Sequence, residues 1–142
     1  MFARETRVPV QQSQIEIQRL LDKAKAKQYG IATDYDLQTA RVQFRLHDRV
    51  IRFTIALPDA AKFRGERFAK AERQKWRALL LVIKAKLESV ESQIETFEEA
   101  FLANIVMPND QTVSDIVTPQ IAESYKTGKM PKALNAAPAE SH

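Results

Sequence analysis

The fold of this chain is decided by residues 76–101, which read WRALLLVIKAKLESVESQIETFEEAF. The large apolar residues of this stretch recur at alternating steps of four and three: Trp76, Leu80, Ile83, Leu87, Val90, Ile94, Phe97 and Phe101. A repeat of about 3.5 residues is typical of a helix with one continuous apolar seam. We therefore expect a single long helix from about residue 72 to about residue 106, with the core built against it.

The second half of this helix predicts self-association. Beyond Leu87 the apolar stripe narrows, and the only charged residues beside it are glutamates. A helix of about 35 residues would be roughly 50 Å long, whereas a strand of about eight residues spans roughly 27 Å, so the helix should extend beyond a sheet. We expect two copies to pair antiparallel, basic half to acidic half, through Val90, Ile94, Phe97 and Phe101. The alternative is that short C-terminal helices fold back and cover these residues.

The chain ahead of the long helix begins with a shorter predicted helix. Residues 6–10 read as a short extended start. The pattern from Ser13 to Glu16 is that of a capping box, in which the serine hydroxyl accepts from a helical amide and the glutamate bonds back to the serine amide. Gly30 is placed to end the helix in a left-handed conformation. We expect the helix to lie between these two signals.

Three strand-like stretches follow, at residues 31–35, 40–47 and 50–57. Apolar and polar residues alternate in the last two, and the short break at residues 47–49 suits an antiparallel hairpin. After a turn at residues 107–110, Thr112 and Thr118 can each cap a short helix, the second ending at Gly128. The predicted fold is α+β: an N-terminal helix and a small antiparallel three-stranded sheet packed on one long central helix, with short C-terminal helices. Residues 1–128 form one domain, and residues 129–142 a disordered tail.

Composition excludes several classes of protein. With 142 residues, 44% of them hydrophobic, the chain suits one globular domain. It has no cysteine, which excludes disulfides, thiolate nucleophiles and cysteine zinc sites. The two histidines, His47 and His142, form no pair with metal-ligand spacing, so we expect no catalytic site, no metal and no cofactor. The longest apolar run has six residues, against about 20 for a membrane span, so we expect a cytoplasmic protein with no membrane partner.

Basic side chains gather in two places. One is the outward row of the predicted hairpin; the other runs from residue 62 to residue 86, where nine Lys or Arg stand against two Glu. Such rows match a phosphate backbone, although the hairpin row offers no aromatic side chain for base stacking. We expect nucleic acid to contact Arg41, Gln43, Arg45, Arg52, Lys62, Arg64, Arg67, Lys70 and Arg73. A solvated strand face and an acidic protein partner remain the alternatives.

Five stretches of the chain carry a resemblance: MFARETRVPV at residues 1–10, RALLLVIKAKLE at 77–88, FEEAFL at 97–102, IVMP at 105–108 and YKTGKMP at 125–131. At these positions the chain resembles an uncharacterised family of small proteins encoded by tailed bacteriophages and prophages. The resemblance covers most of the chain and is weakest at residues 59–72. It implies a phage or prophage origin and therefore the cytoplasm of the host cell. It implies no activity, cofactor or catalytic residue.

These observations predict a non-enzymatic phage or prophage accessory protein that acts by binding. The leading hypothesis is contact with nucleic acid, or with a nucleic-acid-handling complex, through the basic sheet face and the basic segment that follows it. The second is a protein-binding inhibitor or adaptor directed at a host complex, such as a defence system. A structural virion component is a third hypothesis, which no feature of the sequence favours.

Overall fold

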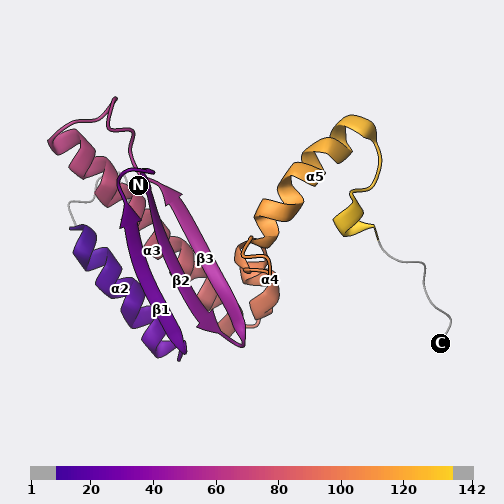
Figure 1. Ribbon diagram of the computed structural model, residues 1–142. Helices are drawn as coiled ribbons and strands as arrows, with labels where there is room; N and C mark the ends of the chain where they lie inside the picture. The colour runs from indigo at the N-terminus through magenta and orange to yellow at the C-terminus, as the bar shows by residue number, and fades with distance from the viewer. Residues whose placement is uncertain (1–8, 136–142) are drawn as a thin grey trace.

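The computed structural model describes residues 9–135 and confirms the predicted α+β fold (Figure 1). The elements are α2 (Val10–Lys23), β1 (Gln28–Asp34), β2 (Thr39–Leu46), β3 (Arg49–Ala56), α3 (Glu66–Glu91), α4 (Phe97–Phe101), the 3₁₀ turn η1 (Leu102–Asn104), α5 (Val113–Thr127) and the 3₁₀ turn η2 (Lys132–Leu134). Helices α2 and α3 cover one face of the sheet, and Figure 1 views the sheet from its other face.

The sheet is an antiparallel meander in the order β1-β2-β3. Leu46 at the end of β2 pairs with Arg49 at the start of β3, so the turn between them has only two residues. These two, His47 and Asp48, have φ angles of 52° and 58°. Two positive φ angles are typical of the type I′ turn, whose twist matches that of the strands. The predicted hairpin is therefore confirmed, with each strand shifted by one residue.

The core lies between the sheet and the two helices that cover it. Alternate residues of β2 point inward, so that Val42, Phe44 and Leu46 are buried as predicted. The helices meet them with side chains that are also buried: Ile17 and Leu21 from α2, and Trp76, Leu79, Leu80 and Ile83 from α3. The predicted apolar stripe of the long helix is therefore core in its first half.

The prediction of one continuous helix from residue 72 to residue 106 is wrong. Helix α3 begins earlier, at Glu66, and ends at Glu91; α4 starts five residues after Ser92, at Phe97. Between the two helices Gln93 adopts a left-handed conformation with φ 62°. Thr96 then caps α4: its hydroxyl accepts from the N–H of Glu99 at 3.1 Å, and the Glu99 carboxylate accepts from the N–H of Thr96 at 2.8 Å. A capping box satisfies the first amides of a new helix, and so stabilises the break.

The seam predicted for a helix dimer does not form one surface. Phe101 is fully buried, with its ring centroid 5.9 Å from that of Phe44 and 6.2 Å from that of Phe53. Val90 and Phe97 pack against the core, whereas Ile94 is 79% exposed. Helix α4 turns back onto the sheet and covers the core within one chain. The predicted antiparallel dimer through these residues therefore loses its structural basis.

The ends of α2 differ from the prediction. The helix begins at Val10 after Pro9, and Ser13 lies inside it, so no capping box forms there. It ends at Lys23, and Gly30 belongs to β1. Pro9 occupies the N-cap position, so the helix starts three residues ahead of the serine. The predicted extended start lies mainly in residues 6–8, outside the described residues.

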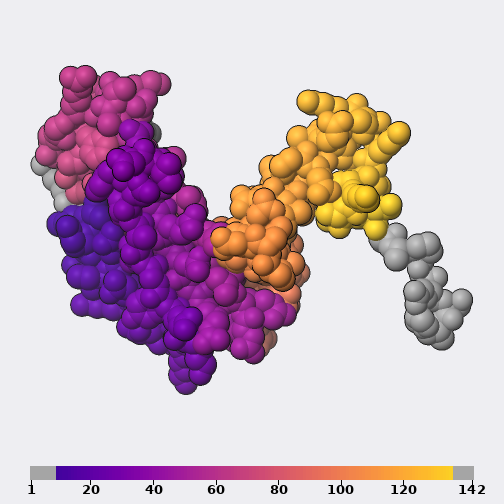
Figure 2. Space-filling model, viewed as in Figure 1, coloured from indigo at the N-terminus to yellow at the C-terminus, as the bar shows by residue number. Residues whose placement is uncertain are grey.

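The C-terminal part forms one helix where two were predicted. Thr112 caps α5 as expected, in a capping box with Asp115, and Gly128 ends it with φ 74°. Thr118 caps nothing, because it lies inside the helix. Residues 129–135, predicted to be disordered, fold back on α5, where the side-chain oxygen of Gln120 accepts from the N–H of Ala133 at 3.0 Å. We call residues 113–135 the arm; Figures 1 and 2 show it standing away from the sheet.

Candidate nucleic-acid interface

No helix covers the sheet face opposite α2 and α3 within residues 9–135, and we call it the outer face. It carries a hollow of about 450 Å³ over β1 and β2. The hollow arises because two small residues of β1 stand opposite two long residues of β2: Gly30 pairs with Gln43, and Ala32 pairs with Arg41. Arg45 completes the same outward row of β2. The outer face is therefore an open, polar surface with room for a ligand.

Arg41 and Arg45 are the free cations of this face. Both side chains are exposed, and neither guanidinium group makes a hydrogen bond or an ion pair with any residue in the range 9–135. They stand four residues apart on β2, which places them about 13 Å apart along the strand. Two exposed guanidinium groups that form no ion pair with the described residues lower the energy of any polyanion that lies along the strand.

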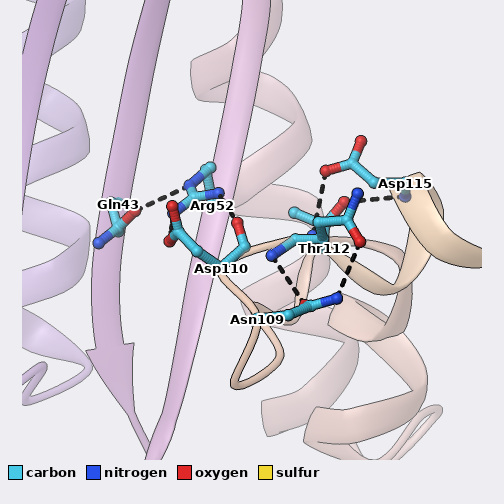
Figure 3. Close-up of polar contacts among 7 residues, drawn as sticks. Gln43, Arg52, Asn109, Asp110, Thr112 and Asp115 are labelled. Atoms are coloured by element: carbon cyan, nitrogen blue, oxygen red, sulfur yellow. Dashed lines mark hydrogen bonds and ion pairs between the residues drawn. The ribbon is translucent and has the colours of Figure 1, made fainter.

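Arg52 lies on the same face, but its guanidinium group is bound within the chain (Figure 3). Its Nε donates to the side-chain oxygen of Gln43 at 2.9 Å, and its Nη1 donates to the carbonyl of Asp110 at 2.8 Å. Its Nη2 forms a 2.6 Å ion pair with the Asp110 carboxylate. Arg52 is only 8% exposed. In this arrangement the Arg52 guanidinium and the side-chain oxygen of Gln43 both have partners within the chain, whereas the sequence predicts that both residues contact nucleic acid.

We call the Arg52–Asp110 pair the latch, because it holds the segment that leads to the arm. This segment first runs along the free edge of β3: Ile105 bridges to Ile51, and the N–H of Val106 donates to the carbonyl of Val50 at 2.8 Å. It then turns over the outer face at Asp110, whose φ is 66°. The latch therefore links the position of the arm to an arginine of the outer face.

The charges of the latch are unequally exposed. The carboxylate of Asp110 is 83% exposed, whereas the guanidinium of Arg52 is almost fully covered. The hydrogen bond from Arg52 lowers the pKa of Asp110 below its ordinary value of 3.8, and the positive charges of Arg52 and, to a lesser extent, Arg41 act in the same direction. Asp110 is therefore ionised at neutral pH and is the anion that neutralises Arg52.

The predicted basic segment does not continue the outer face as one track. Arg67 and Arg73 belong to α3, in the helix layer behind the sheet, and both have local partners: Arg67 lies 5.5 Å from the ring centroid of Phe63, and Arg73 pairs with Glu66 at 2.9 Å. Three further cations have exposed side chains that make no hydrogen bond or ion pair with the described residues: Lys62, Arg64 and Lys70. The structure brings Arg41, Gln43, Arg45 and Arg52 together on the outer face, and it places Arg67, Lys70 and Arg73 on α3, in the layer behind the sheet.

Asp110 is the site residue that sequence reasoning missed. Its position in a Met-Pro-Asn-Asp stretch indicates a turn, which the structure confirms, but gives no signal for an arginine 58 positions earlier. Gly30, which the sequence predicts at a helix end, lies in β1 and lines the hollow.

Other kinds of site are not seen in the described part of the chain. No three His, Cys, Asp or Glu side chains of residues 9–135 are gathered so that they could hold a metal ion. No helix among the same residues is both long and apolar enough to cross a membrane. The chain matched no protein-family model, no curated protein and no solved structure with which it was compared.

Proposed function

We propose that this protein is a phage or prophage accessory protein, acting in the host cytoplasm, that binds nucleic acid through the outer face of its sheet. The observation that supports this is the pair of exposed guanidinium groups, Arg41 and Arg45, beside a hollow of about 450 Å³ on an open sheet face. Phosphate contacts from arginine supply most of the affinity of sequence-independent binding. Because the face lacks aromatic residues for stacking, its contacts are with the backbone and not with the bases.

The first prediction concerns these two arginines. Replacing Arg41→Gln and Arg45→Gln together should weaken binding to a labelled single-stranded DNA of about 20 nucleotides roughly tenfold or more at about 50 mM salt. The slope of log affinity against log salt should fall by about 1.4, since each lost phosphate contact on a single strand releases about 0.7 counterions fewer. Fluorescence anisotropy at several salt concentrations measures both quantities.

The matched control is Arg19→Gln with Lys126→Gln, which removes the same charge from α2 and α5. This control variant should retain most of the affinity, because a net-charge effect alone is small at the salt concentrations used. Equal losses in the two variants would reject the outer face as the binding site. No binding of the wild-type protein at about 50 mM salt would reject the function itself.

The arm favours a second function, that of a protein-binding adaptor or inhibitor. Helix α5 has no buried residue, although it is capped at both ends. Its apolar side chains Ile121 and Tyr125 are 40% and 89% exposed. Apolar and aromatic residues on a protruding helix are typical anchors for the groove of a partner protein. We therefore propose protein binding by the arm as the runner-up.

The second prediction tests the adaptor function. Replacing Ile121→Glu and Tyr125→Glu should leave the unfolding of the sheet and of α3 unchanged, because neither side chain reaches the core. If the arm binds a host protein, the tagged wild type should enrich that protein from nuclease-treated infected cells, and the variant should enrich it at least about tenfold less. The control Glu123→Gln, on the same helix, should behave as wild type. Enrichment that is the same for all three proteins would reject the arm as a binding element.

A further inference from the structure

Arg52 stands where it could serve the outer face as a third cation. It is the direct cross-strand neighbour of Gln43, which lies between Arg41 and Arg45 on β2. It is therefore diagonal to both arginines, at about 7–8 Å between backbone positions, a distance that long side chains span. A phosphate backbone that contacts Arg41 and Arg45 passes within reach of the Arg52 side chain. Among the described residues, the only anion that forms an ion pair with Arg52 is Asp110.

The bonds that hold Arg52 can be taken over by a phosphate. A carboxylate and a phosphate present similar oxygen pairs to a guanidinium group, and both bind it by charge-assisted hydrogen bonds. The Asp110 carboxylate is 83% exposed, so a ligand can approach the latch from solvent. The bond from Nε to Gln43 lies on the sheet and need not break. The exchange therefore replaces one anion by another at an arginine that stays in place.

The exchange has a consequence for the arm. Asp110 contributes both its carboxylate and its carbonyl to Arg52, so its displacement removes two of the contacts that hold the segment before α5. We propose that a backbone phosphate of the bound nucleic acid displaces Asp110 from Arg52, and that binding at the outer face thereby releases the arm. Asp110 is then an internal competitor that sets the affinity of the site. This inference rests on the proposed nucleic-acid function.

Hydrogen exchange of the wild-type protein provides the direct test. With a single-stranded DNA of about 20 nucleotides at saturation, amides of residues 105–113 should exchange about fivefold faster or more, in line with ordinary coupling energies. Amides of β2 should exchange more slowly, because the ligand covers that strand. Simple binding protects amides, so faster exchange at one side of the site is a specific signature of release.

Affinity gives an independent test. Asp110→Asn should bind the same DNA about five- to tenfold more tightly, because the competitor is weakened. The control Asp36→Asn removes an equal charge from the turn between β1 and β2, and its affinity for the DNA should rise much less. In a chain that also carries Arg52→Met, the gain from Asp110→Asn should vanish, since the contested cation is absent.

The outcomes separate this inference from the function on which it rests. DNA binding that depends on Arg41 and Arg45 but leaves exchange of residues 105–113 unchanged or slower would reject the latch exchange and keep the function. An equal gain for Asp110→Asn and Asp36→Asn would do the same. Absence of any DNA binding would reject both.

Discussion

Replacing Phe101 by alanine is expected to lower the free energy of unfolding by about 3–5 kcal/mol, whereas replacing Ile94 by alanine should change it by less than about 0.5 kcal/mol. Phe101 is fully buried between Phe44 and Phe53, and its removal leaves a cavity that the sheet cannot close. Ile94 lies in the segment between α3 and α4 and is 79% exposed. Urea unfolding of the two variants and the wild type measures the difference.

The comparison is sharp because the two residues are equivalent in the apolar ladder of residues 76–101. In a continuous helix they would share one seam, and both variants would be affected alike. Similar losses of stability for Phe101→Ala and Ile94→Ala would therefore contradict the break between α3 and α4. A variant with Thr96→Ala removes the cap of α4 and should cost about 1 kcal/mol, which is consistent only with a helix that starts at this point.

The long helix shows what periodicity can and cannot predict. The steps of four and three identify Trp76, Leu80 and Ile83 as core residues, and all three are buried. The same steps continue through residues 92–96, where the chain is not helical, because a turn followed by a new helix can return an apolar side chain to the core. The Thr96-Phe97-Glu98-Glu99 stretch has the pattern of a capping box, a signal for a helix start that the prediction of one long helix does not use.

The sequence predicts only the part of the candidate site that follows from the alternation of residues along neighbouring strands. Alternation along β2 places Arg41, Gln43 and Arg45 on the face opposite the core, and the structure confirms that placement. The ion pair of Arg52 joins positions 52 and 110 of the chain. Pairs so far apart in the sequence leave no trace in local periodicity or composition. The separation of the basic segment has the same cause, since charge counting along the chain cannot tell which layer of the fold a helix joins.

The latch makes the arm sensitive to the chemistry of a single arginine. Replacing Arg52 by methionine keeps the aliphatic stem but removes charged hydrogen bonds to Asp110 and a bond to Gln43. We expect the free energy of unfolding to fall by about 1.5–3 kcal/mol, the usual contribution of hydrogen bonds that involve a charged group. In a hydrogen-exchange measurement, amides of residues 105–113 should exchange faster than in the wild type. Amides of α2 should exchange only as fast as the lower free energy of global unfolding requires.

The same latch predicts how stability depends on pH. The pKa of Asp110 is lowered in the folded protein, chiefly by its hydrogen bond from Arg52, so the unfolded chain binds a proton at this site at higher pH than the folded chain does. The stabilisation from the latch is therefore complete above the ordinary pKa of 3.8 and is lost as the pH falls through the lowered value.

The difference in stability between the wild type and Asp110→Asn should be constant from about pH 7 to about pH 5 and should shrink from about pH 4 downward. Glu99, whose pKa is also lowered, titrates in both proteins and so cancels in this difference. Urea unfolding at each pH measures it, and a difference that grows on acidification would mean that Asp110 does not pair with Arg52 in solution.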